Sequence, residues 1–262
     1  MIVRMLTAWM IAGLLITSSF GDEATLSNPP KGSLIIVGGG GMPSTIVDRF
    51  MELAGGNAAK IVVIPTATEK PDPEERLVAR WKGRGAVSVK VLHTTDRNVA
   101  DTEAFVAELK EASGVWIGGG SQTRLSNVYA GTAVERELKT LLARGGVVGG
   151  TSAGAAIQCQ TMIAHSKPVP VMGVGFDLLP GAIIDQHFLA RNRMNRLLYA
   201  VQHHPGLVGI GIDEATAIEV HGNECQVLGD SFVTLVLGTG TKRPLDIQTF
   251  PAGKTFTIPA AE

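Results

Sequence analysis

The sequence predicts an α/β protein built on a mostly parallel β-sheet with helices on both faces. Short apolar runs alternate with segments of helical periodicity through the first two thirds of the chain. The apolar runs contain few polar residues, which is typical of strands buried on both faces. Several of them end directly in glycine-rich turns, as the strand-to-helix connections of such sheets do.

Strands and helices are expected to alternate from residue 33 onward. The predicted order is strand 33–37, helix 44–54, strand 60–65, helix 73–82, strand 88–92, helix 101–111, strand 114–117, a helical stretch over 125–144 and strand 146–149. Right-handed crossovers place the carboxyl ends of these strands at one edge of the sheet. Open α/β sheets bind their ligands at this edge.

The last third of the chain changes to short strands separated by turn residues. These strands are predicted at 208–212, 215–220, 225–228 and 232–237. We expect them to form an antiparallel extension of the same sheet. No internal linker is long enough to divide the chain, so residues 32–262 are expected to form a single domain.

Composition limits the range of functions. The chain has 262 residues, 45% of them hydrophobic, which is enough for one sizeable core. Its 23 basic and 24 acidic residues give a net charge of −1, which provides no overall field for nucleic acid or an anionic membrane. Since only 5% of the residues are aromatic, a stacking surface for single strands is not expected either. We expect no nucleic-acid partner.

The N-terminus has the pattern of an export signal. Arg4 precedes an apolar run over 5–16, and the small residues Ser19 and Gly21 fit a cleavage site. We predict a signal peptide over 1–21, a flexible leader over 22–31 and a secreted or periplasmic product. A retained membrane anchor is the alternative. Beyond the signal, no run approaches the roughly 20 apolar residues of a membrane span, so no stable membrane association is expected after cleavage.

Ser152 is the candidate nucleophile, since it lies in the sequence Gly-Thr-Ser-Ala-Gly at 150–154. A residue in a sharp turn between strand and helix needs small neighbours, and its hydroxyl then projects from the sheet edge. The N–H of Ala153 is then one candidate oxyanion donor, at the positive end of a helix. A glycine-rich turn with a capping hydroxyl is the alternative interpretation.

A second glycine-rich turn follows the neighbouring strand 114–117. Without side chains, the turn at 118–120 allows backbone N–H groups to approach a substrate carbonyl closely. Gly120 is the candidate for the second oxyanion donor. A simple tight turn explains the glycines equally well.

His187 is the candidate base. It ends the sequence Ile-Ile-Asp-Gln-His at 183–187, an apolar strand with polar residues at its carboxyl end, which places the imidazole at the functional edge. Arg191, Arg193 and Arg196 follow in a predicted helix, where 193 and 196 share a face. Guanidinium groups in this position can bind substrate carboxylates in bidentate fashion. A solvated basic face is the alternative.

The cysteines, the spacing of possible metal ligands and the glycines at 38–41 indicate no disulfide, metal site or nucleotide-binding loop. Cys159 and Cys225 are the only cysteines, and buried free thiols are favoured over a disulfide. No set of cysteines, histidines and carboxylates has zinc-like spacing, so we infer no metal and no cofactor. The glycines at 38–41 lack the Gly-Lys-Ser/Thr and Gly-x-Gly-x-x-Gly patterns of nucleotide-binding loops.

Together these motifs resemble those of the cyanophycinases and cyanophycinase-like members of the S51 serine peptidases, which are related to aspartyl dipeptidase. The matching segments are Gly-Gly-Gly-x-Gln at 118–122, Gly-Gly-Thr-Ser-Ala-Gly-Ala-Ala at 149–156, Asp-Gln-His-Phe at 185–188, Arg-x-Arg-x-x-Arg-Leu at 191–197 and Gly-Ile-Gly-Ile-Asp-Glu at 209–214. Their order and spacing agree over about residues 32–238.

The resemblance implies a three-layer α/β/α sandwich like that of class I glutamine amidotransferases. It implies Ser152 as nucleophile and His187 as general base of a homodimeric serine exopeptidase. The implied substrate is cyanophycin, a polyaspartate with arginine on its side chains, or a related β-aspartyl peptide, cut to aspartyl–arginine dipeptides. The residues implied to line the pocket for this unit are Gln122, Asp185, Gln186, Arg191, Arg193 and Arg196.

One departure from the family pattern concerns the third member of the triad. The family usually places a carboxylate in the loop after the nucleophile helix, but residues 164–171 contain no acid. Asp177, the nearest carboxylate in sequence, is the candidate. Because a Ser-His pair without an orienting acid loses several orders of magnitude in rate, a non-catalytic or weakly active protein that binds acidic or arginine-rich polymers is an alternative. An α-aspartyl dipeptidase is another.

Overall fold

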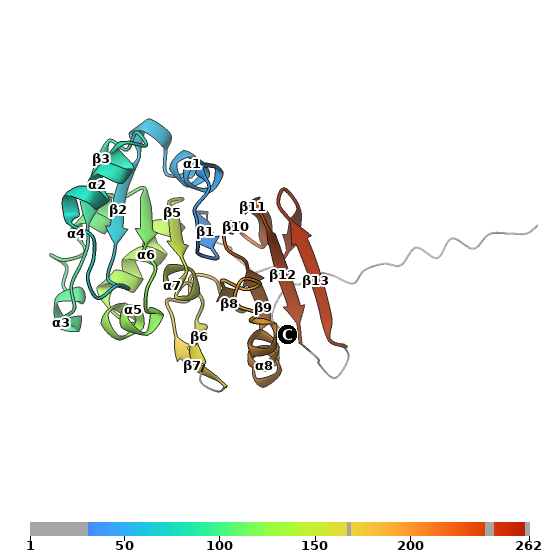
Figure 1. Ribbon diagram of the computed structural model, residues 1–262. Helices are drawn as coiled ribbons and strands as arrows, with labels where there is room; N and C mark the ends of the chain where they lie inside the picture. Colours follow the sequence, from blue (N-terminus) through green and yellow to red (C-terminus); the bar gives the residue numbers. More distant parts are fainter. Residues whose placement is uncertain (1–30, 167–168, 239–243, 260–262) are drawn as a thin grey trace, which may run out of the picture.

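A computed structural model of the chain describes residues 31–166, 169–238 and 244–259 (Figure 1). The predicted signal peptide and the leader up to residue 30 lie outside these ranges. Within them, no helix has the length and apolar character needed to cross a membrane.

The main sheet has eight strands in the order β14-β11-β10-β1-β5-β4-β2-β3. Its parallel strands are β1 (Ser33–Val37), β5 (Val147–Thr151), β4 (Gly114–Ile117), β2 (Lys60–Ile64) and β3 (Ser88–Val91). The antiparallel strands are β10 (Thr216–His221), β11 (Glu224–Gly229) and β14 (Thr255–Thr257). A mostly parallel sheet with an antiparallel C-terminal extension is thus confirmed.

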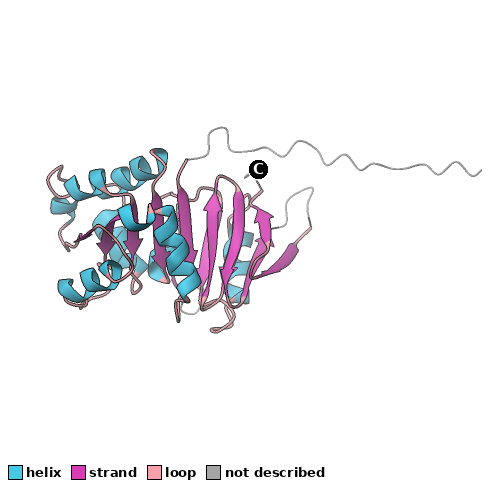
Figure 2. Ribbon diagram, turned by 90° about the horizontal axis from the view of Figure 1, so that it is seen from above, coloured by secondary structure: helices cyan, strands magenta, loops and turns pink. Residues whose placement is uncertain are grey.

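Helices cover both faces of this sheet (Figure 2). On one face lie α1 (Ser44–Leu53) and α2 (Glu74–Lys82), and on the other lie α4 (Ala107–Glu111), α5 (Gln122–Tyr129), α6 (Ala133–Ala143) and α7 (Ala153–Ala156). Successive residues of β2 alternate between the two cores: Ile61 and Val63 pack with α1 and α2, while Val62 and Ile64 pack with the opposite layer. This is the expected three-layer arrangement.

A second sheet of four strands has the order β13-β12-β9-β8. It consists of β8 (Ala182–Gln186), β9 (Val208–Ile212), β12 (Phe232–Leu237) and β13 (Asp246–Pro251), and α8 (Met194–His203) packs on it. The expectation that 208–212 and 232–237 extend the main sheet is therefore wrong. Because β9 pairs with β8 on one side and with β12 on the other, it has no free edge for the main sheet.

Several elements differ from the predicted boundaries. The expected helix 101–111 is replaced by α3 (Arg97–Ala100), capped by the Asp96 carboxylate, and by α4. The helical stretch 125–144 divides into α5 and α6 near Gly131, whose φ is 73°. The remaining elements are the hairpin of β6 (Thr161–Ser166) and β7 (Pro170–Val174) and the 3₁₀ helix η1 (Gly56–Ala58). Cys159 and Cys225 are buried and free, as expected.

The two sheets meet at the carboxyl ends of their parallel strands. The N–H of Ser152, just after β5, donates to Val37 O at the end of β1 over 3.0 Å. The N–H of His187, just after β8, donates to Gly38 O over 2.6 Å. Residues that follow β1, β5 and β8 are thereby brought to one place.

Candidate active site

Ser152 lies in a strained turn between β5 and α7. Its φ is 54° and its ψ is −108°, a conformation that a residue with a side chain rarely adopts. A Cβ on Gly150 would lie 2.1 Å from Gly154 O, and a Cβ on Gly154 would lie 2.2 Å from Ile117 O. A side chain at either of the two glycines that flank the serine would therefore clash with neighbouring backbone. A nucleophile elbow needs small residues at these positions for this reason.

His187 reaches Ser152 from the second sheet. Its Nε2 lies 2.9 Å from Ser152 Oγ, within hydrogen-bond distance. The backbone of His187 also has a positive φ, 50°, which turns the imidazole back over the end of β1. The expected pairing of nucleophile and base is therefore present in the geometry.

Glu214 orients the imidazole from its other side. Its Oε1 lies 2.5 Å from His187 Nδ1, and the residue follows β9, the strand that pairs in parallel with β8. With Nδ1 donating to the carboxylate, Nε2 is left to accept the proton of the serine hydroxyl. Ser152, His187 and Glu214 thus form a continuous hydrogen-bonded triad.

Asp177 is not the third member of this triad, contrary to expectation. Its carboxylate lies 3.7 Å from Lys139 Nζ, while the Nδ1 of His187 is occupied by Glu214. Glu214 ends the family-like segment 209–214, and the sequence alone does not predict its role. The available signal was an acid at the carboxyl end of a buried strand, at the same edge as His187.

The glycine-rich turn after β1 makes room for the imidazole. A Cβ on Gly39 would lie 2.3 Å from His187 Cε1, and the φ of Gly39 is 103°. A Cβ on Gly40 would lie 2.7 Å from the Cβ of Glu214. The glycines at 38–41, whose role the sequence left open, therefore allow the base and its acid to pack directly on the backbone.

The two turns that carry the candidate oxyanion donors border the serine. Ala153 is the first residue of α7, so its N–H has no partner within the helix. The turn at 118–120 runs beside the nucleophile, since a Cβ on Gly119 would lie 3.4 Å from the Cβ of Ser152. Gly120 has a φ of 141°, and a Cβ there would lie 2.3 Å from Ala67 O.

Gln186 and Arg193 connect the triad to the start of α8. Gln186 Oε1 lies 3.5 Å from Ser152 Oγ and accepts a hydrogen bond of 2.9 Å from Arg193 Nη1. Burial and the neighbouring charge of Arg196 lower the pKa of Arg193 to about 10. Arg193 therefore remains protonated at neutral pH and sets a positive charge one side chain away from the nucleophile.

Two of the expected pocket residues have internal partners instead. Asp185 is fully buried and binds the Arg196 guanidinium through both carboxylate oxygens. The Gln122 side chain is buried and donates to Ile163 O over 2.8 Å. The carboxylate of Asp185 thus holds Arg196 in place, and the amide nitrogen of Gln122 holds β6. Neither Asp185 nor Gln122 lines the adjacent cavity.

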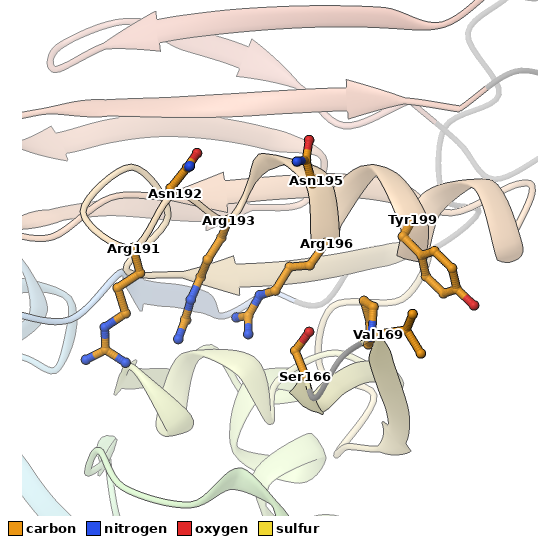
Figure 3. A pocket seen from close by; sticks show the side chains of 9 residues that line it. Ser166, Val169, Arg191, Asn192, Arg193, Asn195, Arg196 and Tyr199 are labelled. Atoms are coloured by element: carbon orange, nitrogen blue, oxygen red, sulfur yellow. The ribbon is translucent and has the colours of Figure 1, made fainter.

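That cavity, of about 500 Å³, lies between the start of α8 and the β6–β7 hairpin. Figure 3 shows the guanidinium groups of Arg191, Arg193 and Arg196 side by side along one wall, with Ser166 and Val169 opposite. Helix α8 begins only at Met194, so Arg191 and Arg193 both precede it, contrary to the predicted helix. Arg191 forms no ion pair with any residue that the structure describes, which leaves its charge available.

The environment of His187 keeps its imidazole neutral. Burial lowers the pKa of His187 below its ordinary value, the hydrogen bond to Glu214 opposes this shift, and the charges of Arg191 and Arg193 add to it. A neutral imidazole can accept the serine proton at pH 7. The site thus combines an oriented nucleophile, a base in the correct protonation state and an arginine-lined cavity.

Comparison with known proteins identifies the family. The model of peptidase family S51 matches residues 34–228. The chain is 34% identical over 221 residues to the cyanophycinase of Geminocystis herdmanii, covering 79% of this chain and 81% of the relative. The chain belongs to peptidase family S51. It is also 38% identical over 202 residues to the cyanophycinase of a Nostoc species, covering 73% and 67%.

This S51 peptidase also shares its fold with a solved structure. A peptidase from an acI-B1 actinobacterium superimposes with a TM-score of 0.66 and 24% identity, over 87% of this chain and 97% of that one. The likeness confirms the fold. Family membership makes the protein a serine-type peptidase, which agrees with the geometry at Ser152.

Replacing Gly39 with Ala tests the packing of the imidazole. The new Cβ would clash with His187 Cε1 in a backbone conformation that disfavours side chains, so we expect the labelling of Ser152 by a fluorophosphonate probe to slow about a hundredfold or more. The matched control is Gly41→Ala, because no atom lies within 4 Å of a Cβ there. Equal labelling of both variants would contradict this assignment.

Replacing Glu214 with Gln tests the triad. The amide can no longer hold the imidazole in the correct tautomer, so the labelling rate should fall by about four orders of magnitude. Asp177→Asn is the control, since Asp177 faces Lys139. If Asp177→Asn and not Glu214→Gln abolished labelling, the assignment of the acid would be wrong.

Acidification should inactivate the protein with a midpoint below about pH 6.5. The pKa of His187 is lower in the folded state than in the unfolded state, so protonation favours unfolding. The free energy of unfolding therefore decreases as the pH falls below about 6.5. The labelling rate between pH 4 and 8 measures the midpoint. Arg191→Gln should raise it, since one positive charge near the imidazole is removed; a wild-type midpoint above pH 6.5 would refute the role of burial.

Proposed function

We propose that this S51 peptidase hydrolyses cyanophycin, or related β-aspartyl peptides, to aspartyl–arginine dipeptides. The main support is the hydrogen-bonded triad of Ser152, His187 and Glu214, which lies beside a cavity lined by arginines. The relatives named cyanophycinase support this substrate class. In cyanophycin each arginine is joined through its α-amino group to a side-chain carboxyl, so every unit carries one free carboxylate for an arginine to bind.

The proposed reaction is acyl transfer through Ser152. Its Oγ attacks the amide carbonyl while His187 Nε2 accepts the hydroxyl proton, and the N–H groups of Ala153 and Gly120 stabilise the negative oxygen. The C–N bond then breaks, and His187 delivers its proton to the leaving amine. Water repeats the sequence on the acyl-enzyme, with His187 again as base, and releases the acid.

The arginine cavity is proposed to hold the unit that acylates the serine. Arg191 offers an uncompensated charge, and Arg193 is fixed next to Ser152 through Gln186. Arg196 is neutralised by the buried Asp185, so it serves mainly as a wall and as an anchor. This arrangement favours a substrate that presents a carboxylate close to its scissile amide.

The alternative of a protein that only binds polymers is based on the absence of an acid from residues 164–171. Glu214, which follows β9, supplies a carboxylate 2.5 Å from His187 Nδ1, and this weakens that alternative. The α-aspartyl dipeptidase alternative shares the same triad and differs only in substrate. Substrate preference therefore has to be measured.

A panel of substrates tests the proposal. The purified protein is incubated with cyanophycin, with β-aspartyl–arginine peptides and with α-aspartyl dipeptides, and the products are identified by mass spectrometry. We expect β-aspartyl–arginine from the first two. Ser152→Ala should lose about six orders of magnitude in rate, whereas Ser88→Ala, at the opposite end of the parallel strands, serves as control. Cleavage of α-aspartyl dipeptides alone would favour the alternative, and no product from any substrate would refute the proposal.

Export and a homodimer are proposed on different grounds. Export rests on the apolar run at 5–16 and its small flanking residues, and the mass of the mature N-terminus decides it. The homodimer rests on family resemblance alone. The molar mass in solution decides that point.

A further inference from the structure

A second cavity, of about 420 Å³, borders the nucleophile turn but is not used by the triad. Its walls come from the turn after β1 and from α1, α2 and the last residue of β5. The residues that line it include Gly40, Met42, Arg80, Trp81, Arg84 and Thr151. None of them lines the cavity at α8.

The second cavity lies directly beside the catalytic residues. Thr151 precedes Ser152 in the chain, and Gly40 packs so closely on Glu214 that a Cβ would come within 2.7 Å of the Cβ of that residue. The cavity therefore borders the turn that carries the nucleophile and the turn after β1 on which the acid packs.

The two cavities lie on opposite sides of the main sheet. The hairpin that walls the α8 cavity is bound to α5, through Gln122 Nε2 to Ile163 O and through Ser126 Oγ to Val174 O. Helix α5 covers one face of the sheet, whereas α1 and α2 cover the other. The nucleophile at the sheet edge thus lies between the α8 cavity on one side and the second cavity on the other.

The second cavity carries positive charge that the described residues do not balance. Arg84 pairs with Asp48 over 2.6 Å, but Arg80 forms no ion pair with any described residue. Both arginines are exposed, and the apolar side chains of Met42 and Trp81 form the adjacent walls of the cavity. A guanidinium group in such a place is suited to a carboxylate.

We propose that this cavity is a second substrate subsite, in which Arg80 and Arg84 bind a carboxylate on the unit that leaves as the amine. The proposal rests on the proposed function, because it assigns the acylating unit to the α8 cavity. Successive aspartyl–arginine units each carry a free carboxylate, so a chain bound across Ser152 places one in each cavity. Arg80 and Arg84 then act as specificity residues on the leaving side.

The test uses two forms of a peptide made of two aspartyl–arginine units. In one form the carboxylates of the leaving unit are free, and in the other they are amidated. Wild type should favour the free form about tenfold in KM, as expected for charge-assisted hydrogen bonds. In Arg80→Gln/Arg84→Gln this preference should fall to about one, while Arg80→Lys/Arg84→Lys should restore part of it.

The matched control is Arg76→Gln/Lys82→Gln, which removes the same charge from α2 at residues outside the cavity. It should keep the tenfold preference. If both double variants lost the preference equally, the preference would come from the overall charge of the protein and the subsite would be refuted. An unaltered preference in Arg80→Gln/Arg84→Gln would also overturn the subsite.

Binding separates this proposal from the proposed function. The affinity of Ser152→Ala for both peptides is measured by calorimetry, with and without the Arg80→Gln/Arg84→Gln change. If wild type cuts neither peptide but the arginine change still abolishes a tenfold preference in binding, the proposed function fails and the subsite stands. If neither peptide binds or is cut, both fail.

Discussion

The triad depends on a junction of backbones between two sheets. Gly38 accepts from His187 N over 2.6 Å, and Gly39 accepts from Ala215 N over 3.0 Å, so the end of β1 holds both the base and the acid. Ser152, His187 and Ala215 all have φ values between 50° and 54°. Such residues cost roughly 1–3 kcal/mol each and persist only where the surroundings fix them. The buried strands behind the junction provide that rigidity.

Electrostatic balance at this junction sets the chemistry. Burial and two arginines favour a neutral imidazole, whereas Glu214 favours its protonated form. The base can therefore accept a proton at neutral pH and is stabilised once it carries one. Below it, the buried Asp185 offsets the charge of Arg196 and also lies 3.7 Å from Arg193 Nη1, so removal of its carboxylate would leave both guanidinium groups without their buried partner.

Local sequence predicted the parallel strands, Ser152 and His187, because apolar runs and glycine-framed turns are local signals. Local sequence does not predict Glu214, because the family pattern places the acid in the loop after the nucleophile helix. The parallel pairing of β9 with β8, which brings Glu214 to His187, is a long-range property. The burial of Asp185 was hidden for a similar reason, since its partner Arg196 stands eleven positions later. The glycines at 38–41 fit several roles locally, and only the imidazole packed on Gly39 distinguishes them.

Charge recognition in this protein has to be local. With a net charge of −1 the molecule exerts little long-range attraction, and a polymer of aspartyl–arginine units is itself close to neutral. Arginines in the α8 cavity and in the cavity between α1 and α2 flank the same serine on opposite faces of the sheet. Under the proposed function, binding then depends on the spacing of carboxylates along the substrate relative to the scissile amide. This geometry would select a neutral polymer, because a guanidinium group binds a carboxylate strongly only at hydrogen-bond distance.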